Sequence, residues 1–281
     1  MKYRICVIGL GLMGASLAGA LRGFRKAEIH GVDVKDDVRK KAERTGVVDR
    51  AFAGVGEGVT GANLVIFCVY AHNIPAMIEK NKLAFSPNAV LSDICGVKTQ
   101  LYEKLSGILP EHIDYVGIHP MAGKERDGFD NADPAIYKNS GMIICPFPNT
   151  MPGNVELLRE MAKHIGVARL AVASPREHDD IIAYTSDLMH IAAAGLCIDY
   201  HPDITPAFTA GAFRDCTRVA DINASAWTEL ILDNRENTLP KLDSYIENLN
   251  KMREAISDGD EARLYSLLDR ACGNKRTILR R

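Results

Sequence analysis

One histidine stands at the end of a short apolar run in the sequence YVGIHPMAGKERDG. His119 closes this run, is followed at once by Pro120, and lies at the carboxyl end of a predicted strand. Ligand sites of open α/β folds gather at such strand ends. Because an imidazole titrates near neutral pH, it can accept a proton without carrying a permanent charge. His119 is therefore a candidate general base, and the alternative is a structural histidine that caps the strand.

Three glycines near the N-terminus have the spacing of a loop that holds a pyrophosphate. Gly9, Gly11 and Gly14 form G-x-G-x-x-G between the apolar run YRICVIG and a helical pattern. The first glycine would allow a tight turn, the second a close approach of the backbone to the phosphates, and the third packing of the helix on the strand. An ordinary tight turn is the alternative. The predicted cofactor-binding loop comprises Gly9, Leu10, Gly11, Leu12, Met13 and Gly14.

An acidic residue, Asp33, follows the glycines near the end of the second apolar run, EIHGVDV. A carboxylate at this place would accept hydrogen bonds from the adenosine ribose and would repel a 2′-phosphate, which favours NAD as the cofactor. Lys35 lies two residues further on and could meet a phosphate, so NADP stays an alternative. A nicotinamide enzyme that oxidises an alcohol also needs a base, and His119 would supply it.

Two arginines in the second half of the chain are spaced to act together. Arg214 and Arg218 are four residues apart in FRDCTRVADINASAW, so on a helix they would share one face. Paired guanidinium groups suit a substrate with more than one carboxylate. Asp215 and Trp227 lie nearby in sequence. A solvated helix face with a surface ion pair is the alternative, although apolar residues beside the arginines favour a buried face.

Short apolar runs alternate with helix-length segments through the first 174 residues. Near-continuous Val, Ile and Leu in these runs predicts strands that are buried on both faces, as in a parallel sheet. The β-α-β alternation favours an α/β fold, with a doubly wound, Rossmann-type dinucleotide-binding domain over residues 1–174. The predicted strands are 3–9, 28–34, 63–70, 89–94, 115–119, 141–146 and 168–174.

The pattern becomes helical after residue 174. The sequence SPRE at 174–177 is a capping box with proline at the first helical position. A long segment follows to about residue 200, with the small residues IAAAG at its centre, and two later segments repeat the helical apolar spacing. No strand signal returns. Residues 175–281 are therefore predicted to form an all-helical second domain.

Composition limits the class of protein. The 281-residue chain is 47% apolar and 25% charged, and its net charge of −2 gives no footprint for nucleic acid or an anionic membrane. Seven separated cysteines, mostly within apolar runs, indicate buried free thiols in a reducing cytoplasm rather than disulfides or a metal site. No apolar run approaches the ~20 residues of a membrane span, and the N-terminus has the pattern of a strand rather than of a signal peptide.

Five segments together resemble the prephenate dehydrogenase family of tyrosine biosynthesis. The resemblance covers nearly the whole chain. The first segment is common to many dehydrogenases, whereas the third and the fifth, in this order and separation, are specific. The segments are GLGLMGASLA, SDICGVK (92–98), HPMAGKERDG (119–128), HDDIIAYTSDLMH (178–190) and FRDCTRVADINASAW (213–227).

The resemblance implies an NAD-dependent oxidative decarboxylation of prephenate, a cyclohexadienol with two carboxylates. Hydride leaves C4, the C4 hydroxyl loses its proton, and the ring carboxylate departs as CO2 to give 4-hydroxyphenylpyruvate. The resemblance also implies a homodimer formed by the helical domain, with each active site near the subunit interface. We expect a monofunctional enzyme, because 281 residues leave no room for a fused chorismate mutase.

The resemblance assigns roles to individual residues. It implies that His119 is the base that hydrogen-bonds the C4 hydroxyl and that Arg218 is the carboxylate clamp. Glu125, Arg214 and Asp215 match an ionic gate at the mouth of the site. The further site residues that it implies are Trp227 and His190 for the substrate, and Val69 and Gly96 for the cofactor.

Two positions depart from the family pattern. The family often has a serine where this chain has Gly96, and that serine helps to hold the histidine and the hydroxyl. The family's SHLPH is SDLMH here, so Asp187 replaces a histidine. Arogenate, which bears an amino group in place of the keto group, is the competing substrate, and an added acid such as Asp187 would suit its ammonium.

Two other classes of protein stay open. A 3-hydroxyacid dehydrogenase has the same GLGLMG start but would need a catalytic lysine on a helix of the second domain, and residues 175–200 contain none. A protein that binds NAD without turnover would be consistent with the absence of the serine at Gly96.

Overall fold

The chain folds into two compact units, Met1–Asn234 and Arg235–Arg281, which are described separately. The structure is a computed structural model that describes residues 2–124, 126–199, 201 and 206–279. The first unit contains a sheet with its helices and a further group of helices, and the second unit is a pair of helices. The domain boundary expected after residue 174 falls within the first unit and stays a prediction.

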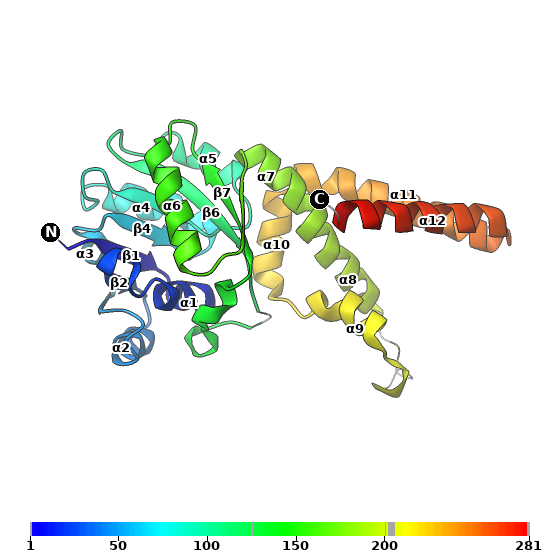
Figure 1. Cartoon of the computed structure of the whole chain (residues 1–281), viewed down its shortest axis with the longest axis horizontal. Helices are drawn as coiled ribbons and strands as arrows, with labels where there is room; N and C mark the ends of the chain where they lie inside the picture. The colour runs from blue at the N-terminus through cyan, green and yellow to red at the C-terminus, as the bar shows by residue number, and fades with distance from the viewer. Residues whose placement is uncertain (1, 125, 200, 202–205, 280–281) are drawn as a thin grey trace. The chain divides into compact units, whose positions relative to one another are not determined.

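An eight-stranded sheet forms the centre of the first unit (Figure 1). The strands are Arg4–Ile8 (β1), Glu28–Val32 (β2), Arg50–Phe52 (β3), Leu64–Phe67 (β4), Val90–Asp93 (β5), Asp114–Met121 (β6), Gly141–Pro146 (β7) and Arg169–Val172 (β8). Their order is β3-β2-β1-β4-β5-β6-β7-β8, and all neighbours are parallel except β6 and β7. The order reverses between β1 and β4, so their carboxyl ends flank the crevice where such sheets bind ligands.

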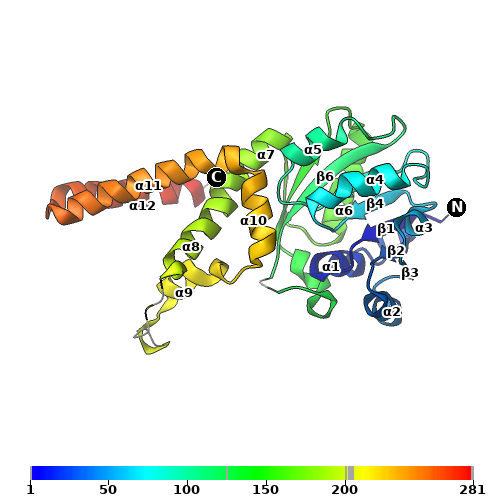
Figure 2. The ribbon, with the colours of Figure 1, turned by 180° about the vertical axis from the view of Figure 1, so that it is seen from behind.

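Helices cover both faces of this sheet (Figure 2). Buried side chains of α1 and α6 join one apolar cluster, and those of α3, α4 and α5 join a second cluster on the opposite face. The helices are Leu12–Ala20 (α1), Asp36–Arg44 (α2), Val55–Val59 (α3), Ile74–Asn81 (α4), Thr99–Leu105 (α5) and Pro152–His164 (α6).

The apolar runs are continuous because the sheet is covered on both sides. Along β1, Ile5 and Val7 enter one cluster, whereas Cys6 and Ile8 enter the other. All four side chains are at most 2% exposed, and burying an aliphatic side chain of this size contributes roughly 1.5–3 kcal/mol. The predicted α/β fold with a doubly wound sheet is confirmed.

The sheet differs from the prediction at three strands. β3 is not among the predicted strands, because its three residues, RAF, are too few to show a periodicity. β7 runs antiparallel to β6, whereas a parallel sheet was expected throughout. All four residues of β8 are exposed in the single chain, since β8 is the edge strand and its faces are not covered there.

The described part of the chain after β8 is helical, as predicted. Ser174 and Glu177 form the expected capping box at the start of the first of these helices. The helices of the first unit are Pro175–Ile182 (α7), Leu188–Ile198 (α8), Gly211–Thr217 (α9) and Ala224–Asp233 (α10). A π-helical turn, Ala183–Asp187, joins α7 to α8 without a break.

The stretch Pro175–Ile198 is long and apolar enough to cross a membrane by length and composition alone. The expectation that no segment approaches this length is therefore wrong. The core helix of a soluble protein passes the same test, and this stretch carries the buried polar residues His178, Asp179 and Asp187. Ionisable side chains of this kind are costly inside a bilayer.

The second unit consists of two helices, Arg235–Ser257 (α11) and Glu261–Leu279 (α12). Gly259, with φ +64°, makes the turn between them, and an ion pair of 2.7 Å joins Glu254 to Arg263. Several large apolar side chains of this unit are between 46% and 70% exposed in the single chain. They include Leu239, Ile246, Leu249, Tyr265 and Leu268.

All seven cysteines are free thiols. The four in the sheet part of the first unit are buried or half-buried, as the sequence predicts. Cys197, Cys216 and Cys272 are exposed in the single chain, so burial was wrongly expected for these three.

Candidate functional site

The glycine-rich loop needs its glycines for steric reasons. Gly9 has φ +91°, and a Cβ there would lie 2.4 Å from the carbonyl oxygen of Cys68. A Cβ at Gly14 would lie 1.8 Å from the carbonyl oxygen of Gly9, whereas a Cβ at Gly11 would meet nothing within 4 Å. Gly11 caps α1 without a side-chain hydrogen bond. The backbone at Gly11 therefore borders open space at the start of α1, and a helix N-terminus with such space beside it is where an anion site can form.

Val69 and Asp33 lie against this loop. A Cγ atom of Val69 would be 2.8 Å from a Cβ at Gly9. Asp33 accepts two backbone hydrogen bonds, from Leu10 to Oδ2 and from Lys35 to Oδ1, both at 2.9 Å. These bonds fix the carboxylate just beyond β2, where dinucleotide-binding folds hold the adenosine ribose.

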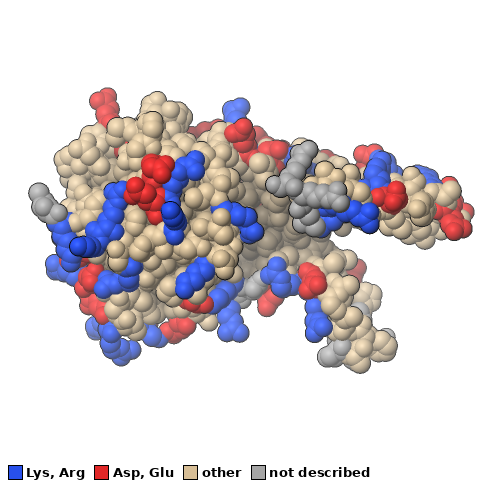
Figure 3. Space-filling model, in the orientation of Figure 1, with Lys and Arg blue, Asp and Glu red and all other residues tan. Residues whose placement is uncertain are grey.

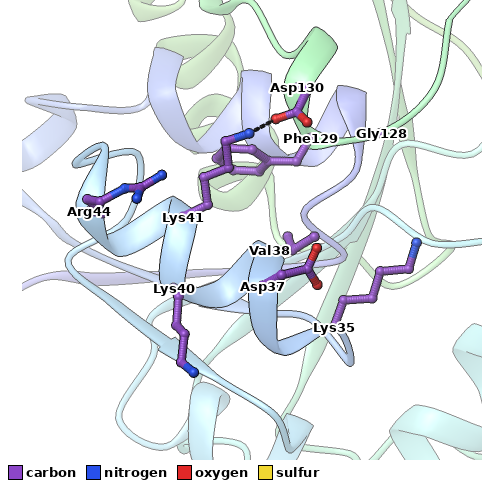
Figure 4. A pocket seen from close by; sticks show the side chains of 9 residues that line it. All are labelled: Lys35, Asp37, Val38, Lys40, Lys41, Arg44, Gly128, Phe129 and Asp130. Carbon is purple, nitrogen blue, oxygen red and sulfur yellow. Dashed lines mark hydrogen bonds and ion pairs between the residues drawn. The ribbon is translucent and has the colours of Figure 1, made fainter.

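A pocket of about 510 Å³ lies near this strand end, between α2 and the 3₁₀ turn Phe129–Asn131 (Figure 4). Two of its basic side chains are ion-paired, Lys41 with Asp130 and Lys40 with Asp36. Lys35 also lines the pocket. This is the lysine that could meet the 2′-phosphate of NADP, and it borders an open space. The lining residues are Lys35, Asp37, Val38, Lys40, Lys41, Arg44, Gly128, Phe129 and Asp130.

His119 lies towards the carboxyl end of β6, is half-buried, and belongs to a chain of three side chains. Its Nδ1 lies 2.9 Å from Nε2 of His178, and Nδ1 of His178 lies 2.7 Å from Oδ1 of Asp179. His178 and Asp179 are at most 1% exposed. Neither was predicted as a site residue, although both lie in the segment HDDIIAYTSDLMH that carries part of the family resemblance.

The order of partners in the hydrogen-bonded series Asp179–His178–His119 fixes the tautomer of His119. An ionised Asp179 can only accept, so His178 donates through its Nδ1–H and accepts at Nε2. His119 then donates through its own Nδ1–H to His178. This assignment leaves Nε2 of His119 unprotonated, which is the form that a general base requires.

Burial and neighbouring charges keep the two imidazoles neutral. The pKa of His119 lies well below its usual value, because burial disfavours the cation, because the two adjacent imidazoles cannot both be charged without repulsion, and because the Lys98 ammonium repels it. Burial also lowers the pKa of His178, although the Asp179 carboxylate opposes this shift. Burial would raise the pKa of Asp179, but hydrogen bonds from His178, Thr99 and Lys98 lower it below its usual value.

Gly96 lies beside the unprotonated nitrogen of His119. A Cβ at this position would be 3.9 Å from Nε2 of His119 and 3.1 Å from a Cδ atom of Leu230. A serine here could reach the imidazole, and this chain does without it. The imidazole of His119 is held at its other nitrogen, Nδ1, by His178. This contact can orient the ring without the serine that the family often has at position 96.

Helix α10 lies along the loops at the carboxyl edge of the sheet (Figures 1 and 2). Its N-cap residue Asn223 donates to the carboxylate of Asp127, in the loop after β6, at 2.9 Å. Glu229 pairs with His72 after β4, at 2.7 Å, and the carbonyl of Asp233 accepts from Gln100 on α5, at 2.7 Å. These contacts hold α10, which carries the predicted site residue Trp227, over the strand ends.

His190 and Trp227, both predicted to contact the substrate, stack on one another. Their ring centroids are 3.4 Å apart and the rings are inclined by 24°. Nδ1 of His190 also donates to the carbonyl of Ser186 at 2.9 Å, which orients the imidazole. The structure therefore brings together two predicted residues from α8 and α10.

The two arginines are not on one continuous α-helix. α9 ends at Thr217, and Arg218 opens the 3₁₀ turn that follows it. Arg214, Asp215 and Arg218 are all exposed in the single chain, so the buried face that the flanking residues favoured is wrong for the single chain. Glu125, the remaining predicted gate residue, lies outside the described residues.

Known proteins resemble this chain in both sequence and fold. The family description "Prephenate dehydrogenase, nucleotide-binding domain" matches residues 17–171, and "Prephenate dehydrogenase, dimerization domain" matches residues 174–270. A cyclohexadienyl dehydrogenase from Zymomonas mobilis is 31% identical over 265 residues, which are 91% of this chain and 90% of the relative.

Two solved structures have the same fold over almost their whole length. Prephenate dehydrogenase from Aquifex aeolicus, in complex with hydroxyphenyl propionate and NAD⁺, is 25% identical with a TM-score of 0.86 and coverage of 99% of both chains. Arogenate dehydrogenase from Synechocystis is 28% identical with a TM-score of 0.82, over 98% of this chain and 99% of that one. With the two family matches, these likenesses show that the chain belongs to the prephenate dehydrogenase family.

Proposed function

We propose that this protein oxidises and decarboxylates prephenate to 4-hydroxyphenylpyruvate, with NAD⁺ as the hydride acceptor. Membership of the family supports the reaction class. The observation that carries the proposal is the hydrogen-bonded chain Asp179–His178–His119, which presents an unprotonated Nε2 at the carboxyl edge of the sheet. A general base held in this way is what the removal of a hydroxyl proton needs.

The residues of the glycine loop fit a dinucleotide. The backbone at Gly11 borders open space at the start of α1, where N–H groups can meet a pyrophosphate. Asp33 is fixed for the ribose hydroxyls and disfavours a 2′-phosphate, which supports NAD over NADP. When bound there, NAD⁺ supplies the acceptor for the hydride that leaves the substrate.

His119 acts on the C4 hydroxyl of the substrate. Its Nε2 accepts the hydroxyl proton as the C4–H bond gives up its hydride, and the bond to His178 supports the imidazolium that forms. The ring carboxylate then leaves as CO2, and its electron pair completes the aromatic ring. The phenolate that results takes a proton back from His119, so the base returns to its starting form.

The two carboxylates of prephenate call for cationic partners. Arg218 is the proposed clamp for one carboxylate, with Arg214, Asp215 and Glu125 at the mouth of the site. Arg214 and Arg218 are exposed in the single chain, and this exposure is consistent with a site that a second subunit helps to cover.

Arogenate is the second candidate substrate, because the similar enzyme from Synechocystis is an arogenate dehydrogenase. An acid near the substrate side chain would favour the ammonium of arogenate. Asp187 does not offer such an acid, since it is 2% exposed and its Oδ2 accepts a hydrogen bond of 2.7 Å from Asn234. This burial supports prephenate as the better substrate.

A matrix of two substrates and two cofactors tests the proposal. Prephenate and arogenate are each assayed with NAD⁺ and NADP⁺, and the reduced cofactor is followed by absorbance. We expect the highest kcat/KM for prephenate with NAD⁺. Higher kcat/KM for arogenate would reverse the substrate assignment, and no turnover in any of the four reactions would refute the proposed function.

We also propose a cytoplasmic homodimer that serves tyrosine biosynthesis. The match to the dimerization domain supports the dimer, as do the exposed apolar side chains of α11 and α12, which are unusual on a monomer surface. The free cysteines are consistent with a reducing compartment. Light scattering after size exclusion should give twice the chain mass of 30.8 kDa, and a mass equal to one chain would contradict the dimer.

A further inference from the structure

Lys98 is a fully buried cation in the loop between β5 and α5. Its side chain is 0% exposed, as is that of Asp93. The ammonium donates to Oδ1 of Asp93 at 2.5 Å and to the carbonyl oxygen of Ile118 at 2.7 Å. Because a buried ammonium is costly even when it is paired, its presence in a core that apolar residues could fill calls for an explanation.

The contact with Ile118 compensates for a gap between two strands. β5 and β6 pair only through Val90 with Asp114 and Leu91 with Tyr115, so β5 supplies no partner further along β6. The ammonium of Lys98 donates to a β6 carbonyl in this unpaired stretch, at the residue directly before His119. Lys98 therefore holds the part of β6 that carries the proposed base.

Strand β6 leaves room for the Lys98 ammonium because residue 117 is a glycine and has no side chain. A Cβ at Gly117 would lie 2.6 Å from Oδ2 of Asp93 and 3.2 Å from Nζ of Lys98. The same carboxylate oxygen accepts a hydrogen bond of 2.9 Å from the hydroxyl of Tyr115. Asp93 is thus bound on both oxygens, and the ion pair is fixed beneath the end of β6.

The backbone of Lys98 is also linked to His119, through Asp179 and His178. The N–H groups of Lys98 and Thr99 donate to the two oxygens of Asp179, at 2.9 and 2.8 Å. Asp179 in turn orients His178, and His178 orients His119. Lys98 therefore contacts both the strand that carries the imidazole and the carboxylate that sets its tautomer.

We propose that Lys98 is a positioning residue of the dehydrogenase reaction, which holds His119 through the Ile118 carbonyl and through Asp179. This inference rests on the proposed function for the role of His119. A residue that only filled the core would need no charge and no donor to the Ile118 carbonyl. The donor to Asp179 is a backbone N–H, which a methionine at this position keeps, so the variant below tests the side-chain contact and the charge.

The charge of Lys98 is also part of its effect on His119. Burial would lower the pKa of Lys98, but the Asp93 carboxylate raises it above its usual value, so Lys98 stays a cation. This cation contributes to the low pKa of His119. The titratable groups that interact with Lys98 or His119 are Asp93 and Cys95 near β5, Cys145 on β7, and His178 and Asp179 on α7.

The double variant Lys98→Met/Asp93→Asn tests the proposal. It removes both charges together, so neither is left buried alone, and the thermal midpoint shows whether it folds. We expect kcat to fall about 10- to 100-fold, because small displacements of a catalytic group have effects of this order. The KM for NAD⁺ should stay unchanged, and the acid limb of kcat/KM should move to higher pH. Wild-type kcat and an unmoved acid limb would overturn the proposal.

Two further measurements separate this role from a general loss of structure. Lys82→Met removes an exposed lysine of a surface ion pair, and it should leave kcat and the acid limb unchanged. The titration of His119 by NMR, assigned with His119→Asn, should show a higher pKa in the double variant. If the wild-type protein turned over neither substrate, the proposed function would fail, whereas this titration would still show whether Lys98 acts on His119.

Discussion

Nδ1 of His119 on β6 lies 2.9 Å from Nε2 of His178 on α7. The proposed base therefore stands on the sheet, and the group that orients it stands on a helix that begins after the last strand. Asp179 joins the two parts, because it accepts hydrogen bonds from the backbone of Lys98 and Thr99 as well as from His178. The tautomer of His119 thus depends on how α7 packs against the sheet.

Asp179→Asn should lower kcat by about 10²- to 10⁴-fold. An asparagine can donate to Nδ1 of His178, which would place a proton on its Nε2 and remove the acceptor for His119. Steady-state assays with prephenate and NAD⁺ measure the effect. Asp180→Asn makes the same chemical change at the next residue and should stay within about threefold of wild type. Wild-type kcat for Asp179→Asn would exclude the hydrogen-bonded chain from catalysis.

The pH dependence of kcat/KM should show the low pKa of His119. The neutral imidazole is the active form, and burial with the nearby His178 and Lys98 keeps it neutral below the usual histidine value of 6.5. As the pH falls through 6.5, kcat/KM should therefore stay constant and should decrease only at lower pH. A pH profile in a constant-ionic-strength buffer gives the midpoint. An acid limb at or above 6.5 would contradict the assignment of His119.

The free energy of unfolding should decrease as the pH falls below 6.5. The pKa values of His119 and His178 are lower in the folded chain than in the unfolded chain, where histidine titrates near 6.5. Below 6.5 the unfolded state therefore binds more protons, and acid favours unfolding. This contribution to stability is fully present above 6.5 and is lost as the pH falls towards the folded pKa values. Thermal midpoints between about pH 5 and pH 8 should decrease on the acid side, and less steeply in His119→Asn.

The local parts of the site could be predicted from sequence, whereas the contacts between distant residues could not. Gly9 and Gly14 follow from a short pattern, because the positive φ of Gly9 and the approach of Gly14 to the carbonyl of Gly9 both arise within the loop itself. His178 lies 59 residues from His119, and a histidine followed by two acids is typical of an ordinary helix surface. Only the packing of α7 on the sheet buries it beside the base.

In the sheet, too, the strands could be predicted from sequence, whereas their direction and pairing could not. The apolar runs predicted seven of the eight strands. Burial on both faces explains the runs of inner strands such as β1 and β4, whereas β8 is apolar in sequence but exposed in the single chain. The direction of β7 could not be predicted, because an antiparallel strand buried on both faces has the same composition as a parallel one. The gap beyond Leu91 and Tyr115 is likewise a property of strand pairing, so no pattern indicates the buried ammonium of Lys98 that lies there.

Gly96→Ser should have little effect on kcat, within about threefold. The imidazole of His119 is already held at Nδ1 by His178, so a hydroxyl near Nε2 is not needed to orient it. The new Cβ would lie 3.1 Å from Leu230, which must shift by a few tenths of an ångström. Gly96→Ala brings the same Cβ without the hydroxyl and serves as the control. A large gain of kcat in the serine variant alone would mean that His178 does not suffice to orient the base.

Arg218→Ala should chiefly raise the KM for prephenate, by about 10- to 100-fold. A charge-assisted hydrogen bond to a carboxylate is worth about 1.5–3 kcal/mol, and it is made in the ground state as well as in the transition state, so kcat should change less. Arg218→Lys keeps the charge but loses the bidentate geometry, and its KM should lie between those of wild type and the alanine variant. Arg159→Ala, on α6, removes an arginine of a surface ion pair with Glu156 and should leave KM unchanged. If KM were also unchanged in Arg218→Ala, the carboxylate clamp would have to lie elsewhere, with Arg214 as the next residue to substitute.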